Sequence, residues 1–123
     1  MKIKRILIAN RGEIAIRIMK TARIMKIETV AIKTAIEPNA MYLSYSDIVY
    51  DNSEDVSDIP VFLDINRIIN IAIKTKADAI HPGYGFLAEN AYFADKCIDN
   101  KILDNKHIIG ASLQHINIHR QYH

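Results

Sequence analysis

One short stretch, residues 80–90, brings together a histidine, a proline, two glycines, a tyrosine and a glutamate. An imidazole near a carboxylate can perform general acid–base catalysis, so His81 and Glu89 form a candidate pair. The alternative, a structural hydrogen bond, is favoured for a histidine that stands alone at a strand end. Pro82 fixes its own φ and keeps His81 extended, and the two glycines permit positive φ and close approach of a ligand. We therefore predict a rigid, shaped turn.

A second turn, residues 10–13, stands where a dinucleotide-binding loop would stand, after a first apolar run. The G-x-G-x-x-G motif needs three glycines, and this turn has Gly12 alone. Glu13 would also repel a phosphate at the start of the following helix. The turn therefore argues against NAD, and the sequence contains no G-x-x-x-x-G-K-[ST] phosphate loop.

Three other groupings carry weaker chemical signals. His115, His119 and His123 have the spacing of one helix face and could bind a metal, but a solvated tail is favoured because no carboxylate lies nearby. The acidic segment 51–60 lacks the ordered spacing of a calcium loop and is interpreted as a surface loop. Ser112 lacks the G-x-S-x-G setting of a nucleophile. No metal site and no catalytic residue are predicted.

Length and composition limit the class of protein. A chain of 123 residues, half of them hydrophobic, is sufficient for one domain with a buried core. A net charge of +2 with dispersed lysines and arginines predicts no nucleic-acid partner, and no apolar run is long enough to span a membrane. The single cysteine, Cys97, fits a reducing compartment and is expected to be a core thiol, so a cytoplasmic location is predicted.

The elements that must position the two turns alternate between strand and helix. Strands are expected at 5–9, 29–32, 48–50, 77–80 and 107–109, and helices at 14–25, 65–75 and 89–99, with one or two helical turns in 40–46 and a polar link at 99–106. This alternation predicts an α/β, Rossmann-like domain with a mostly parallel sheet and helices on both faces. Because each glycine turn follows a strand, one edge of the sheet is expected to be the site face, and it would carry Gly12, Gly83, Gly85 and Gly110.

Helical periodicity also predicts which side chains point inward. The expected inward residues are Ile14, Ile18, Ala22 and Met25 in the first helix, Ile65, Ile68, Ile69, Ala72 and Ile73 in the second, and Ala91, Ala94, Cys97 and Ile98 in the third.

With their flanking residues, the two turns resemble the two signatures of the biotin carboxylase N-terminal domain. The first signature is IANRGEIAIRI at 8–18, and the second is ADAIHPGYGFLAEN at 77–90. Shorter segments that also resemble the family are 29–31, 62–63 and 109–112. The resemblance runs from Lys4 to about Ile116. It implies a pre-ATP-grasp α/β domain at residues 1–112, followed by an unpatterned tail at 113–123.

The resemblance implies a function. Biotin carboxylases use ATP, bicarbonate and Mg²⁺ or Mn²⁺ to carboxylate biotin on a biotin carboxyl carrier protein. The product serves the carboxylation of acetyl-CoA in fatty acid biosynthesis, of propionyl-CoA or of pyruvate. By resemblance, the biotin-side cleft would be lined by His81, Pro82, Gly83, Tyr84 and Gly85, with Tyr84 the best candidate for contact. The residues expected to pack against the partner domain are Asn10, Arg11, Gly12, Glu13, Glu89 and Asn90.

The departures from the family pattern are largest near the end of the sequence. Ala111 replaces a proline, and residues 115–123 do not continue the pattern into the ATP-grasp domain. The lysines that hold ATP, the metal carboxylates and the bicarbonate arginine have no counterpart, so no cofactor is predicted for the isolated chain. We expect a truncated, split or frameshifted biotin carboxylase whose partner is the ATP-grasp and C-terminal part. The alternative is a non-catalytic remnant or interaction module of the same fold.

Smaller departures lie inside the domain. Lys26 stands near an expected glycine, and Ala88 replaces a serine. Lys20 and Ile24 replace a charged pair at the dimer interface of some bacterial members, so the resemblance does not decide whether this chain makes that dimer contact.

Overall fold

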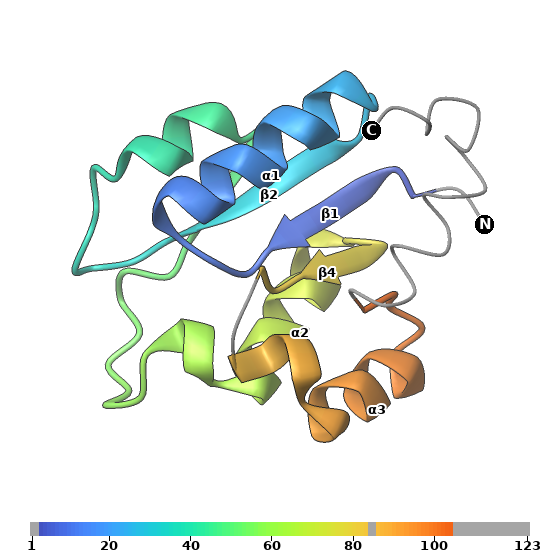
Figure 1. Cartoon of the computed structure of the whole chain (residues 1–123). Coiled ribbons are helices and arrows are strands. Elements are labelled where there is room, and N and C mark those ends of the chain that lie inside the picture. The colour runs from blue at the N-terminus through green and yellow to red at the C-terminus, as the bar shows by residue number, and fades with distance from the viewer. Residues whose placement is uncertain (1–2, 84–85, 105–123) are drawn as a thin grey trace.

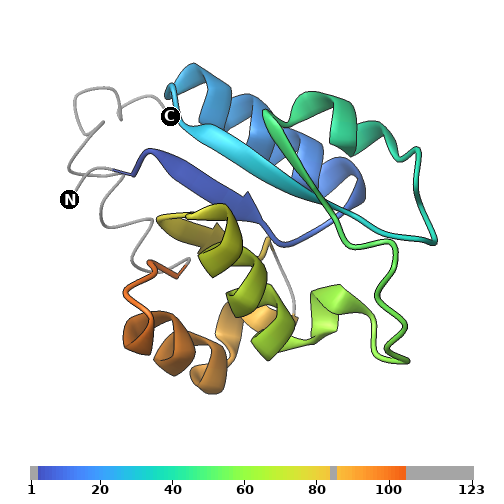
Figure 2. The same ribbon diagram turned by 180° about the vertical axis from the view of Figure 1, so that it is seen from behind.

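The computed structural model of the chain describes residues 3–83 and 86–104. Within these ranges four strands form one parallel sheet in the order β3-β2-β1-β4, with helices on both faces (Figures 1 and 2). The elements in chain order are β1 (Arg5–Ile8), α1 (Gly12–Ile24), β2 (Glu28–Lys33), the 3-10 helix η1 (Met41–Tyr45), β3 (Ile48–Asp51), the 3-10 helix η2 (Val61–Leu63), α2 (Ile65–Thr75), β4 (Ala79–His81), the 3-10 helix η3 (Phe86–Glu89) and α3 (Ala91–Asp99). The predicted α/β class is confirmed.

The core lies in two layers, one on each face of the sheet. Ile6 and Ile8 of β1 pack in the cluster that contains α1 and η1. Leu7, between them, packs in the cluster formed with α2, α3 and η2. Alternate residues of a strand point to opposite faces, so a strand covered on both sides must be apolar at every position. This explains the continuous hydrophobic runs of β1 and β2.

The chain returns to the sheet beside β4 at Leu103, a few residues before the strand that the sequence predicts at 107–109. Ala79 of β4 forms a parallel bridge with Leu103, and the Ile80 N–H donates to the Leu103 carbonyl at 2.9 Å. Ile102 is buried beside it. The prediction that 99–106 is a polar link is therefore wrong, because two apolar residues join the core and the sheet there. The predicted strand at 107–109 lies outside the described residues.

The predicted helix faces are only partly correct. In α1 the buried residues are Ala15, Ile16, Met19 and Ala22; of the four predicted for that helix only Ala22 is buried, and Ile14, Ile18 and Met25 are half-buried. The helix contacts both β2 and η1, so the face that it buries is rotated about the helix axis relative to the predicted apolar stripe.

The other two helices show the same kind of error. In α2 the predicted Ile68, Ile69 and Ala72 are buried and Ile65 packs against the core, whereas the predicted Ile73 is 49% exposed and Ile71, which was not predicted, is buried. An isoleucine-rich helix has apolar residues on more than one face, so hydrophobicity does not fix the arc that meets the sheet. In α3, Phe93 and Cys97 are buried, and the inward predictions fail at Ala91 and Ile98, which are exposed, and at Ala94, which is half-buried.

At or just after the end of each of the three described α-helices lies a lysine in the left-handed region. The φ angles are 61° at Lys26, 58° at Lys76 and 58° at Lys101. Glycine is the usual residue at such a position, because a Cβ is strained there. The glycine that the resemblance expects near Lys26 therefore has a structural reason in this chain.

The single cysteine is a core residue, as predicted. Cys97 is fully buried on α3, and burial raises the pKa of its thiol to about 12, with a further contribution from the charge of Asp104. A thiol with this pKa is protonated and inert at neutral pH. Within the described ranges, no helix is both long and apolar enough to cross a bilayer.

Candidate functional site

The two signature turns lie side by side at the carboxyl edge of the sheet. β1 and β4 are neighbours with Ile8 opposite His81, and the Ala9 N–H donates to the His81 carbonyl at 2.9 Å. The chain therefore enters both turns from adjacent strand ends. The prediction that Gly12 and Gly83 share this edge is confirmed, whereas Gly85 and Gly110 lie outside the described residues.

Asn10 joins the two turns. Its side-chain Nδ2 donates to the Pro82 carbonyl at 2.8 Å, and its Oδ1 accepts from the Arg11 N–H at 2.8 Å. Pro82 and Gly83 are buried, so the Pro82 carbonyl needs a partner within the protein. The Asn10 Nδ2 meets this need, while the Oδ1 of the same carboxamide stabilises the first turn through the Arg11 N–H.

Gly83 fits closely against this carboxamide. It has φ +74°, and a Cβ built on it would lie 2.3 Å from Asn10 Nδ2 and 3.1 Å from Ile14 Cγ2. The Gly83 N–H donates to His81 Nδ1 at 3.0 Å. An imidazole nitrogen that accepts a hydrogen bond is unprotonated, and burial lowers the pKa of His81, so the ring is neutral at pH 7. The hydrogen bond that a structural His81 requires is thus present.

The remainder of the first turn faces outward. Gly12 has φ +67°, and a Cβ there would meet nothing within 4 Å. Glu13 is exposed in the first turn of α1. The Arg11 Nε and Nη2 donate to Glu37 Oε1 and Oε2, both at 2.5 Å, which lowers the pKa of Glu37 and raises that of Arg11. This ion pair joins the first turn to the segment that follows β2.

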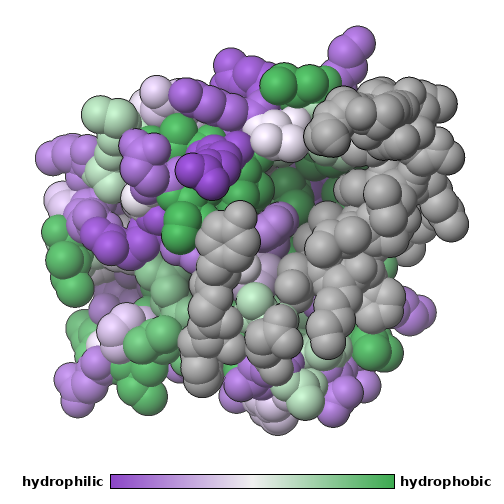
Figure 3. Space-filling view, viewed as in Figure 1, coloured by the Kyte–Doolittle hydropathy of each residue, from purple (hydrophilic) through white to green (hydrophobic). Residues whose placement is uncertain are grey.

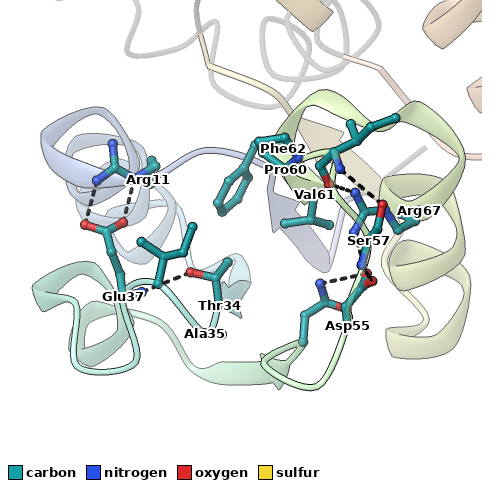
Figure 4. A pocket seen from close by; sticks show the side chains of 13 residues that line it. Arg11, Thr34, Ala35, Glu37, Asp55, Ser57, Pro60, Val61, Phe62 and Arg67 are labelled. Carbon is teal, nitrogen blue, oxygen red and sulfur yellow. Dashed lines mark hydrogen bonds and ion pairs between the residues drawn. The ribbon is translucent and has the colours of Figure 1, made fainter.

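A pocket of about 290 Å³ opens beside this ion pair, above the ends of β2 and β3. Figure 4 shows Arg11 and Glu37 on one wall and Asp55 and Arg67 on the other, with Phe62 among the residues between them. The apolar part of the lining consists of Ala35, Ile36, Ile59, Pro60, Val61 and Phe62. The carboxyl edge thus has two halves. At β1 and β4 the described parts of the two turns are hydrogen-bonded to each other, and we call this the closed half. At β2 and β3 lies this pocket, and we call this the open half.

Arg67 organises the second wall. Its Nε donates to Asp64 Oδ2 at 2.9 Å, and its other nitrogens contact Asp55 and the Ile59 carbonyl. Burial opposes ionisation of Arg67, but the hydrogen bonds to Asp55 and Asp64 outweigh it and raise the Arg67 pKa; they also lower the pKa values of both carboxyls. Arg67 of α2 therefore anchors the acidic segment 51–60, which the sequence indicated only as a surface loop.

Hydrophobic side chains are exposed around this open half. Ile36 is 89% exposed, Val56 94% and Ile59 54%. Figure 3 shows hydrophobic surface at the left and lower left, over the segments that follow β2 and β3, among strongly hydrophilic side chains. Sequence reasoning missed this pocket, because each segment on its own has the composition of a solvated loop.

Of the other predicted site residues, the structure gives a local role to one. Asn90 caps α3, since its Oδ1 accepts from the Phe93 N–H at 3.0 Å. Tyr84, Gly85, the Glu89 side chain and the tail histidines lie outside the described residues, so the His81–Glu89 pair stays a prediction. Among the residues that the structure does describe, no three His, Cys, Asp or Glu side chains are grouped as a metal site.

A parallel α/β domain with two joined strand-end turns defines the class, and comparison with known proteins identifies the family. Residues 2–116 match the family described as "Biotin carboxylase, N-terminal domain". The chain belongs to this family.

Several relatives agree. Pyruvate carboxylase from Staphylococcus aureus is 41% identical over 95% of this chain and 10% of its own length, and biotin carboxylase from Nostoc sp. is 45% identical over 83% of this chain and 23% of its own. Among solved structures, the biotin carboxylase domain of a thermophilic 2-oxoglutarate carboxylase bound to bicarbonate matches with a TM-score of 0.75 at 40% identity, over 85% of this chain and 23% of that one. This chain spans between a tenth and a quarter of these relatives.

Proposed function

We propose that this chain acts as the N-terminal domain of a biotin carboxylase and that its second signature turn forms one side of the biotin cleft. The observation that carries the proposal is the family match over residues 2–116, which includes both turns. The side-by-side position of the turns supports it, because open α/β sheets bind ligands beyond the carboxyl ends of their strands. The boundary at residue 112 and the cytoplasmic location stay predictions.

The described residues do not fit ATP or a divalent metal. The turn after β1 lacks the three glycines of a nucleotide-binding loop, and no acidic or histidine group among the described residues is suited to a metal. We therefore assign ATP, bicarbonate and Mg²⁺ or Mn²⁺ to the ATP-grasp and C-terminal part of the family's proteins. There, ATP would activate bicarbonate for transfer to biotin on its carrier protein. This chain would contribute a rigid turn with a neutral imidazole.

The proposal concerns the biotin step and not the final acceptor. The relatives are named for different acceptors, pyruvate and 2-oxoglutarate among them. The biotin half-reaction is the chemistry that such enzymes share, so it is the activity that a domain common to them can support.

Complementation tests this function. The 123-residue chain would be mixed with the part of Nostoc biotin carboxylase that lies beyond the matched region. ADP formation dependent on both biotin and bicarbonate is expected only when both polypeptides are present. The Nostoc N-terminal segment serves as the positive control. A complex without turnover would favour the interaction-module alternative, and no complex at all would overturn the proposal.

Tyr84 gives a finer test of the biotin cleft. In the complemented enzyme, Tyr84→Ala is expected to raise the KM for biotin about tenfold, equivalent to ~1.4 kcal/mol of lost contact, and to leave the KM for ATP unchanged. Tyr92→Ala is a matched control, because Tyr92 is 48% exposed on α3. Equal effects of both substitutions on biotin would contradict the assignment.

A further inference from the structure

The place where Asn10 sits is the switch point of the sheet. From β1 the chain moves to β2 on one side, and β4 lies on the other, so the connections diverge between β1 and β4. In open α/β sheets this divergence leaves a crevice that commonly receives a ligand. Here the Asn10 carboxamide crosses from β1 to the Pro82 carbonyl. A side chain of the protein itself therefore bridges the two strand ends at this switch point.

The partners of the Asn10 carboxamide determine which end is the oxygen and which is the nitrogen. The Pro82 carbonyl can only accept a hydrogen bond, and the Arg11 N–H can only donate one. The Asn10 NH₂ must therefore point to Pro82 and the Asn10 oxygen to Arg11, as the 2.8 Å distances show. An aspartate has the same shape but lacks the donor, so it would place a carboxylate oxygen against the Pro82 carbonyl oxygen.

Packing reinforces this contact. Gly83 lies so close to Asn10 that a Cβ would be 2.3 Å from Nδ2, and its N–H is held by His81 Nδ1. The turn is thus held from two sides, by a side chain of its own strand and by a side chain from the other signature. Removing the second support leaves the buried Pro82 carbonyl without its donor.

We propose that Asn10 is a positioning residue that fixes residues 81–83 for biotin, rather than a residue that packs against the partner domain. The first signature then sets the geometry of the second. This inference rests on the proposed function for its role in catalysis, but the contact between the two turns can be tested independently of any activity.

The first measurement is amide hydrogen exchange in the full chain. In Asn10→Asp, exchange of the Gly83 N–H is expected to accelerate at least about tenfold relative to the amides of β1, because the turn loses its donor while the sheet remains. Asn70→Asp is the matched control, an exposed asparagine of α2. Asn10→Ala removes the donor without adding charge and guards against an effect of charge alone. If Gly83 exchange changes no more than that of β1, the proposal is overturned.

The second measurement is kinetic and uses the complemented enzyme. Asn10→Asp and Asn10→Ala are expected to raise the KM for biotin about tenfold while the KM for ATP stays constant, as expected for a residue that positions one substrate's cleft. Faster Gly83 exchange with an unchanged KM for biotin would overturn the positioning role. If wild-type chain fails to complement, the proposed function fails, while the exchange result still decides whether Asn10 holds the turn.

Discussion

The two halves of the carboxyl edge are built from different interactions. At β1 and β4, Asn10 and His81 hold Pro82 and Gly83 through hydrogen bonds at 2.8 and 3.0 Å, with no room for an added Cβ at Gly83. At β2 and β3, a pocket of about 290 Å³ lies between two sets of ion pairs, with exposed apolar side chains around it.

The difference indicates which half determines shape. Short neutral groups in a buried site have few alternative positions, and a lost partner is costly there. Ion pairs on long, partly exposed side chains contribute little and can rearrange. The Arg11 side chain, for example, is 55% exposed despite its bidentate contact. We therefore expect the closed half to tolerate substitution poorly and the open half to adapt to whatever covers it.

The largest effect is expected from Gly83→Ala, which would break the closed half. The new Cβ combines a strained φ with a clash against Asn10, and together these should destabilise the fold by about 3 kcal/mol. Gly12→Ala has a similar φ but open space, so it should cost only about 1 kcal/mol. Urea denaturation of both variants measures the difference.

A double variant isolates the clash. In an Asn10→Ala background the cost of Gly83→Ala should fall, because Nδ2 and Cγ of Asn10 are gone while the strain in φ remains. Equal costs for Gly12→Ala and Gly83→Ala, or a Gly83→Ala cost independent of Asn10, would show that the closed half is not closely packed.

A smaller effect should separate the two halves by pH. The folded-state pKa of His81 is lowered by burial, so the unfolded chain binds the proton more readily, and stability falls once the pH drops below about 6.5. The carboxyls of Glu37 and Asp55 also have lowered pKa values, caused first by hydrogen bonds from Arg11 and Arg67, and their contribution is lost only below about pH 4. Acidification should weaken the closed half first.

The check compares wild type with His81→Gln, which cannot titrate. Subtracting the two stability profiles removes the contribution of every other histidine. The difference, wild type minus variant, should decline as the pH falls below about 6.5 and be flat at higher pH. Parallel profiles across this range would mean that His81 has the same pKa in the folded and unfolded chain.

The smallest effects are expected at the helix ends, where strain acts without a clash. Lys26→Gly, Lys76→Gly and Lys101→Gly should each stabilise the domain by about 0.5–1 kcal/mol, because glycine adopts positive φ freely. Arg17→Gly, at an exposed position inside α1, should instead destabilise by about 1 kcal/mol. These values give the scale of backbone strain against which the clash at Gly83 is judged. Loss of stability in the lysine variants would contradict the assigned conformations.

The strands and their shared edge could be predicted from the sequence because they depend on local pattern. Continuous β-branched runs predict β1 and β2, and turns after parallel strands must share one edge. The contact between Asn10 and Pro82 could not be predicted, because it joins residues 72 positions apart through the strand register. The ion pair between Arg11 and Glu37 could not be predicted for the same reason, because its partners are also far apart in the sequence. Local sequence patterns indicate which turns lie next to each other. Only the folded structure shows which atoms of those turns are in contact.

The burial of Cys97 has a practical consequence. It is the chain's one cysteine, and it lies on the buried face of α3, the helix that Asn90 caps. A thiol reagent can modify it only while α3 is transiently open, so the labelling rate reports the frequency of opening. The labelling rate of Cys97 therefore measures the local opening of α3 in the protein without any substitution. A partner that binds the carboxyl edge and stabilises α3 would slow this reaction, and no engineered residue is needed to measure it.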